Sequence, residues 1–291
     1  MKQEGAMLSK VELRQKVLYP VVRVRTDKSG GSGVLIYSKA DSKNEGKFIN
    51  VILTCQHVVD DCIKIKKEWN PVAKADRKRD ILEEVNVELF DYDGSRVLSA
   101  NSTKGDIIGY DARHDIAAVR LHDHRHHEYT ATIIPEAVIP SLELPDPVWT
   151  SGCSLLHEPF MNPGTVTFLR EVIDQEEYLM SNAPSVFGNS GGGLFHGDTG
   201  HFLGLTSRIT TINLGFSVDV MTWMGFSTHP KRLYEFFRDQ ELHFLFDEKD
   251  DFYKAMARRE KRQKEALRAG LVQAEEDEAE APKWRGSGEE Q

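Results

Sequence analysis

Residues 187–193 read Phe-Gly-Asn-Ser-Gly-Gly-Gly, a loop that holds a serine between glycines. Glycine permits backbone angles that other residues avoid, and it lets a substrate main chain approach closely. The hydroxyl of Ser190 can therefore be presented to a carbonyl carbon as a nucleophile. The backbone N–H groups of Gly188 and Ser190 can converge on one point and stabilise an oxyanion. The loop indicates acyl transfer, although glycine clusters also occur in plain turns.

A serine hydroxyl is a poor nucleophile at neutral pH and needs a base within hydrogen-bond reach. The apolar run 51–54 leads, through Cys55 and Gln56, to His57. A free imidazole titrates near about 6.5, so it can accept a proton and return it. His57 is therefore the candidate general base.

A third group has to orient that imidazole and stabilise its charged form. Asp115 is the candidate, because it directly precedes the apolar run 116–119. Asp106, Asp111 and His114 are alternatives, but none of them directly precedes this run. The chain order His, Asp, Ser is that of the chymotrypsin-type triad and differs from the order in α/β-hydrolases.

Four motifs in this order resemble the trypsin/chymotrypsin family of serine peptidases, and its Deg-type branch in particular. The family pattern of Gly-Ser-Gly, Leu-Thr-x-x-His-Val-Val, Asp-Ile/Leu-Ala-Val and Gly-Asn-Ser-Gly-Gly is met at 31–33, 53–59, 115–119 and 188–192. A weaker match is Pro-Gly-Thr-Val-Thr at 163–167. The resemblance covers about residues 20–220. It implies a serine endopeptidase that acts on polypeptides and uses no cofactor and no metal.

The resemblance also implies an all-β fold of two packed six-stranded antiparallel β-barrels, with a short N-terminal helix and a C-terminal helical extension. The expected parts are an N-terminal helix at 1–18, a first barrel at 19–128, a second barrel at 129–228, C-terminal helices at 229–270 and an acidic disordered tail at 271–291. His57 and Asp115 would come from the first barrel, and Ser190 from the second. Deg-type peptidases usually carry a peptide-binding PDZ module after the barrels, but this tail is too short and too polar to form one.

Two departures from the digestive enzymes bear on activation and specificity. Those enzymes place an aspartate before the serine, where it pairs with a newly cut N-terminus. Asn189 cannot make that ion pair, so we expect activity without N-terminal cleavage. At the base of the primary pocket, Pro184 stands where trypsin has an acid. We therefore expect a preference for small or medium apolar side chains before the cleaved bond.

The opposite wall of that pocket is expected from residues 205–208 and 215–217. Ser207 matches the family position whose backbone pairs with the substrate chain. Arg208 stands where the family often has an apolar residue, so it favours nearby acidic side chains unless it points outward. Gly215 is the third residue expected to bind substrate.

Composition limits the function further. The chain has 291 residues, a net charge of −9 and an apolar fraction of 40%. This charge argues against general nucleic-acid binding, and no apolar run is long enough to cross a membrane. The first residues lack the apolar core of a secretory signal. Three cysteines, Cys55, Cys62 and Cys153, are sparse for a secreted trypsin and favour a reducing, cytoplasmic compartment.

The remaining segments give local predictions. Ser9 and Glu12 form a capping-box pattern that opens a short helix. Residues 64–84 are a charged insertion with expected helix character, and their bases face solvent or, alternatively, bind a partner. Residues 122–127 contain four histidines; we interpret them as a polar linker between the barrels rather than as a metal site.

The end of the chain changes character. Pro230 is placed to begin a helix, and the residues expected to form its apolar stripe are Leu233, Phe236, Phe237, Leu242 and Phe244. Residues 254–268 contain seven bases and two acids, whereas residues 271–291 contain seven acids and two bases. The basic part is predicted to be an exposed helix, and the extension is a candidate site for a protein partner.

Two other classes of function stay open. The first is a protease-fold module without catalysis, which binds a partner through its cleft or its basic tail. The second is an α/β-hydrolase esterase, which fits the Gly-x-Ser-x-Gly spacing at 188–192. It would need a later acid and histidine, such as Asp219 with His229 or His243. Dense short strands without alternating helices argue against it.

Overall fold

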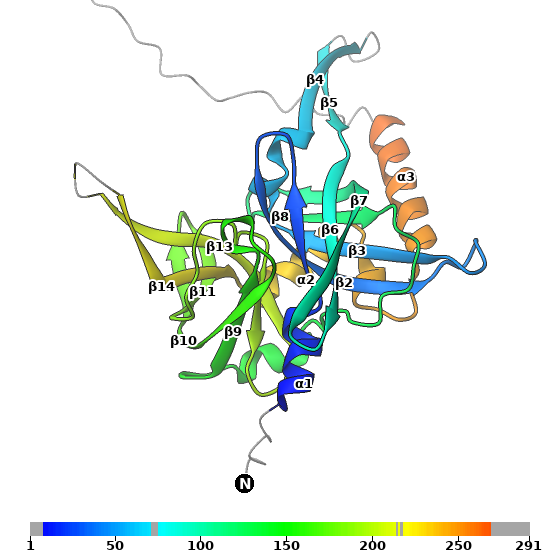
Figure 1. Ribbon diagram of the computed structural model, residues 1–291. Helices are drawn as coiled ribbons and strands as arrows, with labels where there is room; N and C mark the ends of the chain where they lie inside the picture. The colour runs from blue at the N-terminus through cyan, green and yellow to red at the C-terminus, as the bar shows by residue number, and fades with distance from the viewer. Residues whose placement is uncertain (1–7, 71–74, 214, 216–217, 269–291) are drawn as a thin grey trace, which may run out of the picture.

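The computed structural model describes residues 8–70, 75–213, 215 and 218–268. Within these residues, two closed antiparallel six-stranded barrels lie side by side (Figure 1). The first has the order β1 (Val21–Arg25), β2 (Gly30–Ala40), β3 (Phe48–Thr54), β8 (Ile116–Leu121), β7 (Arg96–Asp111) and β6 (Val85–Asp93). The second has the order β10 (Phe160–Ile173), β11 (Glu176–Ser181), β14 (Val218–Thr228), β13 (Phe202–Asn213), β12 (Gly193–His196) and β9 (Pro147–Gly152). The predicted all-β fold is confirmed.

The strand β3 shows why the first barrel forms. Its β-branched and aliphatic residues are buried in an almost continuous run, as expected for a strand that is covered on both faces. Leu53 pairs with Ala118 of β8, and both side chains are fully buried. Phe195, Phe202 and Leu205 of the second barrel belong to the same buried cluster. The two barrels are therefore held together by shared apolar packing.

The charged insertion is a β-hairpin, so the prediction of helix character at 64–84 is wrong. Strands β4 (Ile63–Asn70) and β5 (Ala75–Leu82) pair from Ile63 with Leu82 to Asn70 with Ala75. Ile63 and Ile65 lie two residues apart, a period that suits a strand and not a helix. The hairpin projects from the first barrel (Figure 1), and its bases from Lys74 to Arg79 have no described side chains.

The N-terminal segment forms the predicted helix in two parts. Helix α1 (Lys10–Leu13) continues into the π-helical turn η1 (Arg14–Leu18). The capping box is present, because Ser9 Oγ accepts from Glu12 N at 3.3 Å and Ser9 N donates to Glu12 Oε2 at 2.9 Å. Short 3₁₀ turns complete the described chain: η2 (Gln56–Val58), η3 (Asp60–Cys62), η4 (Glu136–Ser141), η5 (Ser154–Leu156) and η6 (His243–Leu245).

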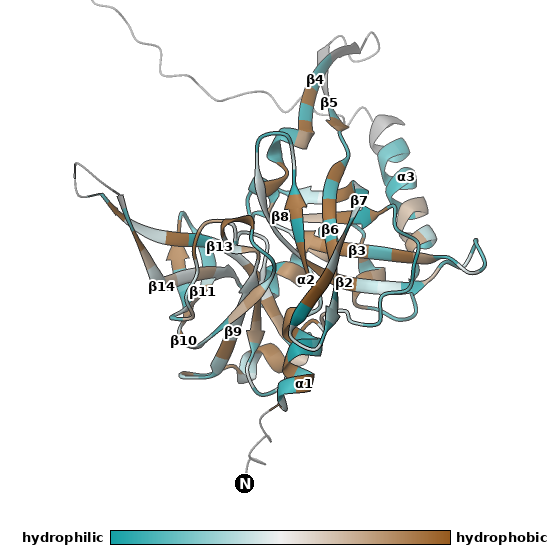
Figure 2. Cartoon of the chain, in the orientation of Figure 1, coloured by the Kyte–Doolittle hydropathy of each residue, from teal (hydrophilic) through white to brown (hydrophobic). Residues whose placement is uncertain are grey.

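Two helices follow the second barrel. Helix α2 (Pro230–Asp239) begins with Pro230 as predicted and buries Leu233, Phe236 and Phe237. Leu242 and Phe244 are buried too, but they lie beyond the end of α2 in the turn at η6. Helix α3 (Phe252–Arg268) packs through Phe252 and Ala255 and is otherwise mostly hydrophilic (Figure 2). The predicted tail at 271–291 lies outside the described residues, and no described helix has the length and apolarity to cross a membrane.

His229, the N-cap residue of α2, should make the stability of the protein sensitive to acid. His229 is buried, and its Nδ1 accepts from Lys231 N at 3.3 Å. Burial lowers the pKa of His229 to about 4; Glu177 opposes this shift, and the more weakly acting cations Arg170, Arg232 and Lys231 add to it. Between pH 6.5 and 4 the unfolded chain therefore binds a proton that the folded chain excludes. The free energy of unfolding should fall by about 3 kcal/mol as the pH drops through this window.

His229→Asn keeps a capping oxygen but cannot titrate. We expect urea unfolding at pH 7, 5.5 and 4 to show a flatter pH dependence for His229→Asn than for the wild type. His124→Asn, a change at an exposed histidine, is the matched control. An equal fall in stability for the wild type and His229→Asn would contradict the prediction.

Candidate active site

His57 lies on the turn η2, directly after the buried strand β3. Its Nδ1 is 2.8 Å from Asp115 Oδ2 and 3.0 Å from Asp115 Oδ1. Its backbone N–H also donates to Asp115 Oδ1, at 3.0 Å. The side chain of His57 is 47% exposed, so the ring is anchored on one nitrogen while it remains open to solvent.

Asp115 lies directly before β8 with a left-handed φ of 56°, and its side chain is 14% exposed. Its Oδ2 accepts a hydrogen bond from Ser207 Oγ of the second barrel at 2.6 Å. Burial alone would raise the pKa of Asp115, but hydrogen bonds from His57 and Ser207 outweigh burial and lower it. The carboxylate is therefore ionised at neutral pH and fixes the orientation of the imidazole.

Ser190 is presented by a loop that depends on its glycines. Gly188 and Gly191 have φ values of 92° and 83°, in the region that favours glycine. A Cβ at Gly191 would lie 2.1 Å from the carbonyl oxygen of Ser32. The carbonyl of Ser190 accepts from Ser32 N at 2.8 Å. The serine loop of the second barrel is thus joined to β2 of the first.

This junction places Ser190 beside the turn that carries His57. A Cβ at Gly31 would lie 2.7 Å from the Ser190 carbonyl oxygen and 2.8 Å from Val58 Cγ2. Ser190 Oγ itself makes no hydrogen bond to any described residue, and none joins it to the His57 ring. The structure therefore brings His57 and Asp115 into contact and leaves the link to Ser190 open. Catalytic hydrogen bonds are often long in proteins without substrate.

The backbone N–H groups of Gly188 and Ser190 donate to no acceptor among the described residues. The neighbouring carbonyls point elsewhere: that of Phe187 accepts from Leu155 N at 2.7 Å, and that of Gly188 accepts from Ser32 Oγ at 2.7 Å. A Cβ at Gly188 would lie 2.6 Å from Leu155 N. Both donors expected for an oxyanion hole are thus free to bind a negative oxygen.

Asn189 holds this loop through neutral hydrogen bonds. Its side chain is buried, accepts from Ser154 Oγ and donates to Ser185 Oγ at 3.2 Å. The network supplies a support for the loop that does not involve the N-terminus. The expectation that no N-terminal cleavage is needed stays a prediction.

The predicted primary pocket needs one correction. Pro184 contributes no charge, and its carbonyl accepts from Thr150 Oγ1 at 3.0 Å. Gly215 lies at the far end of the β13–β14 hairpin, where its N–H donates to Asn213 Oδ1. The six steps from Ser207 to Asn213 extend about 20 Å along the strand. The assignment of Gly215 to the pocket is therefore wrong, because β13 continues well beyond the barrel rim.

A different glycine, Gly225, faces the segment around Pro184. A Cβ at Gly225 of β14 would lie 3.4 Å from Ser185 Cβ, on the segment that leads to Ser190. Gly225 pairs with Ile209 of β13, two residues after Ser207. Sequence reasoning did not single out Gly225, although a glycine inside a strand can mark a site that a ligand approaches.

Arg208 does not point freely into solvent. Its Nη1 is 2.6 Å from Asp174 Oδ2, and its guanidinium lies 5.2 Å from the centre of the Tyr178 ring. The hydrogen bond to Asp174 raises the pKa of Arg208. Asp174 thus neutralises the cation that was expected to attract acidic side chains.

Removing this neutralisation should change specificity. In Asp174→Asn the Arg208 charge is uncompensated, so the ratio of kcat/KM for acidic over neutral peptides should rise about two- to fivefold, the range of a partly exposed ion pair. Paired peptides that differ by Glu and Gln at one position measure the ratio. Arg208→Gln should remove any such gain in the double variant; an unchanged ratio in Asp174→Asn would contradict the role of Arg208.

Two groups of described residues have the spacing of metal ligands. One is the site itself with the thiol of Cys55, and the other is Glu84, Asp106 and His122. In the second group Lys104 already pairs with Glu84 and Arg120 with Asp106, so cations of the chain occupy both carboxylates. Cys55 is fully buried, and burial raises the pKa of its thiol.

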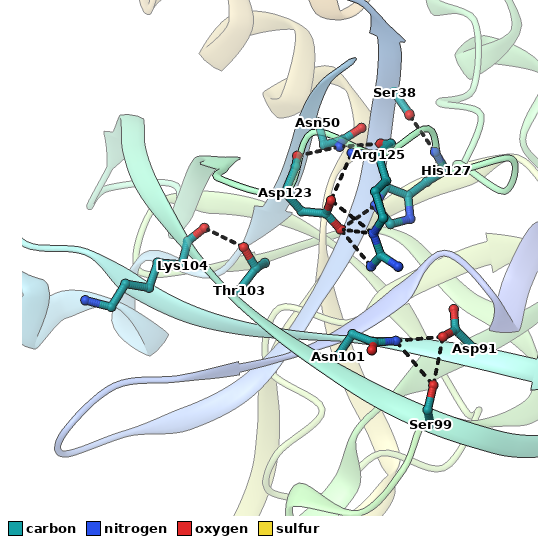
Figure 3. Close-up of polar contacts among 10 residues, drawn as sticks. All are labelled: Ser38, Asn50, Asp91, Ser99, Asn101, Thr103, Lys104, Asp123, Arg125 and His127. Atoms are coloured by element: carbon teal, nitrogen blue, oxygen red, sulfur yellow. Dashed lines mark hydrogen bonds and ion pairs between the residues drawn. The ribbon is translucent and has the colours of Figure 1, made fainter. Parts of the chain in front are cut away.

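The four histidines of residues 122–127 do not converge. His127 Nε2 and Arg125 Nη2 both bind Asp123, at 3.2 and 2.9 Å (Figure 3). Asn50 of β3 donates to the carbonyls of Asp123 and Arg125 (Figure 3). His126 packs instead on the Phe48 ring. These contacts anchor the segment to the first barrel, which supports the interpretation as a linker.

The chain resembles known proteins both in its sequence pattern and in its fold. A family model described as a trypsin-like peptidase domain matches residues 31–205, whereas no curated protein sequence matches. The solved structure of the HtrA-type protease AlgW with tripeptide has a TM-score of 0.56 at 16% identity, covering 80% of this chain and 63% of that one. The crystal structure of Deg5 has a TM-score of 0.52 at 19% identity, covering 77% of this chain and 90% of that one. The present chain thus spans less than two thirds of AlgW, and at these identities the likeness establishes the fold alone.

Proposed function

The chain belongs to the trypsin-like peptidase family, and we propose that it is a serine endopeptidase that cleaves polypeptides through an acyl-enzyme. One observation carries the proposal. Ser207, Asp115 and His57 form a continuous line of hydrogen bonds beside a serine loop. That loop offers the two free N–H groups of Gly188 and Ser190.

In the proposed reaction, Ser190 Oγ attacks the carbonyl carbon while His57 Nε2 takes the hydroxyl proton. The carbonyl oxygen becomes an oxyanion and binds the N–H groups of Gly188 and Ser190. His57 then donates the proton to the leaving amine, and the C–N bond breaks to leave an acyl ester. Water attacks that ester with His57 again as the base, which releases the acid and restores Ser190. Asp115 stays ionised and stabilises the imidazolium.

We propose small or medium apolar side chains before the cleaved bond. Pro184 brings no charge to the pocket, and Gly225 leaves space beside Ser185. A peptide library of mixed sequence, analysed by mass spectrometry of the products, tests this preference. Enrichment of Lys or Arg at the cleaved position would contradict it.

The experiment that tests the activity is labelling with a fluorophosphonate, which reacts with an activated serine. The wild type should gain one adduct at Ser190, as read by intact mass and peptide mapping, and Ser190→Ala should gain none. Folded wild-type protein that takes up no label would support the alternative, a binding module without catalysis. The open link between Ser190 and His57 is the observation that keeps this alternative in the test.

The esterase alternative is not supported by the fold. His229 caps α2, His243 lies 3.4 Å from Arg258, and Asp219 pairs with Ile212 on the projecting hairpin. These residues lie on separate elements, and the two barrels lack the alternating helices of an α/β-hydrolase. Binding of a protein partner by the C-terminal extension and a cytoplasmic location both remain proposals; the three cysteines are buried and free.

A further inference from the structure

A cluster of charged side chains lies directly beside the site, where the turn from β7 to β8 meets the second barrel. Asp111 folds this turn: its Oδ1 accepts from Arg113 N at 2.9 Å and from His114 N at 3.2 Å. Its Oδ2 lies 2.5 Å from His114 Nδ1. One carboxylate thus fixes both the backbone of the turn and the ring of His114.

The other ring nitrogen of His114 reaches across to the second barrel. His114 Nε2 is 3.1 Å from Oε2 of Glu176, the first residue of β11, in a close contact that lacks hydrogen-bond geometry. The side chains of His114 and Glu176 are 12% and 6% exposed. A carboxylate buried to this extent is costly unless it is paired. Glu176 therefore depends on the groups that face it.

Cations from two further positions complete the surroundings. Arg113 Nε lies 2.5 Å from Glu176 Oε1, and Arg232 Nη2 of α2 lies 3.7 Å from Glu176 Oε2. Arg232 also pairs with Glu235 at 2.6 Å. The groups around His114 thus come from the turn, from β11 and from α2, and they include both signs of charge.

From this arrangement we propose that Asp111, His114 and Glu176 form an interbarrel bridge that positions Asp115. Asp115 follows His114 directly and holds a φ of 56°, in the left-handed region that aspartate adopts more readily than most residues but that is still uncommon outside glycine. The bridge supplies a constraint there, because it holds the residue before Asp115 by a hydrogen bond at Nδ1 and by a close contact with Glu176 at Nε2.

The bridge also joins the two barrels close to the triad. His57 and Asp115 come from the first barrel, and Ser190 and Ser207 from the second. The hydrogen bond from Ser207 Oγ to Asp115 crosses this boundary at 2.6 Å, and the bridge crosses it next to that bond. His114 is thus a positioning residue that acts through Asp115. This role rests on the proposed function, since it concerns the same triad.

The test combines a rate with a signal that does not need activity. The rate is second-order fluorophosphonate labelling of Ser190 between pH 5 and 9. The signal is the downfield proton resonance between His57 Nδ1 and Asp115, assigned by its loss in His57→Ala. In His114→Ala we expect labelling to be about 10- to 100-fold slower, its acid midpoint to move to lower pH, and the downfield resonance to weaken or vanish.

Matched variants separate positioning from general damage. His122 directly follows β8, and its Nε2 lies 3.0 Å from Asp106 Oδ1 of β7, at the opposite end of this strand pair from His114. His122→Ala removes this contact and should label within about twofold of the wild type. Glu176→Gln keeps the size of the far partner but removes its charge, and should slow labelling in the same direction. If the bridge is one unit, His114→Ala with Glu176→Gln should be no slower than the worse single variant.

Each outcome decides the proposal. His114→Ala that is folded, labels at the wild-type rate and keeps the downfield resonance would overturn it. If His114→Ala does not fold, Glu176→Gln carries the same two readouts, and an unchanged rate and resonance there would overturn it as well. If the wild type takes up no label, the proposed activity fails, and the resonance alone still shows whether His114 holds Asp115 against His57.

Discussion

Replacing His57 with alanine is expected to lower kcat for peptide cleavage by about a million-fold, the loss seen when the base of such a triad is removed. Without the imidazole, Ser207 is the described side chain that still donates a hydrogen bond to Asp115. Its hydroxyl does not replace the base that takes the Ser190 proton. Residual cleavage would come from the free N–H groups of Gly188 and Ser190 and from substrate binding. Single-turnover cleavage of a quenched fluorescent peptide covers the required range.

His124→Ala is the matched control, because His124 is an exposed histidine on the linker, away from the catalytic loop. It should keep wild-type kcat and KM. Cleavage by His57→Ala at near the wild-type rate would exclude the triad, and it would also point to a different base for Ser190. Equal melting temperatures of the two variants would show that the loss is chemical and not a loss of fold.

Asp115→Asn is expected to lower kcat by about ten-thousand-fold with little effect on KM. The carboxylate accepts from the backbone and ring of His57 and from Ser207 Oγ. An amide offers one acceptor oxygen in place of two. If its NH2 faces His57 Nδ1, the ring carries its proton on Nε2 and cannot accept the proton of Ser190.

The pH dependence of stability gives this variant an independent readout. The pKa of Asp115 lies below its ordinary value near 3.8, so the wild type holds the stabilisation from this carboxylate above about pH 4 and loses it as the pH falls further. Asp115→Asn should lack that acid-dependent part in urea unfolding. A variant with full kcat, or with a loss confined to KM, would contradict the orienting role of Asp115.

The parts of the site that depend on local backbone geometry could be predicted from the sequence. Gly188 and Gly191 need positive φ angles, and the loop around Ser190 shows this need in its composition. His57 follows a buried strand whose apolar run is visible in the sequence. The two N–H donors follow from the same loop.

The errors occur where long-range pairing decides the structure. Gly215 appeared to suit the pocket by its distance along the chain, but the length of β13 carries it to the hairpin end and leaves Gly225 opposite Ser185. The composition of the insertion did not reveal a strand period, because a run of charged residues is compatible with a helix and with a hairpin alike. Their pairing from Ile63 to Leu82 depends on the partner strand.

The amino-acid sequence alone determined which chemical groups this protein has for acyl transfer, because a serine between glycines and a histidine after a buried strand are local features. Only the tertiary structure decided how they meet: that Ser207 supports Asp115 across the barrel boundary, and that His114 reaches Glu176. The physical reason is that backbone conformation depends mainly on neighbouring residues. Contacts between residues 62 positions apart (114 and 176) and 92 positions apart (115 and 207) depend on strand register and on barrel closure.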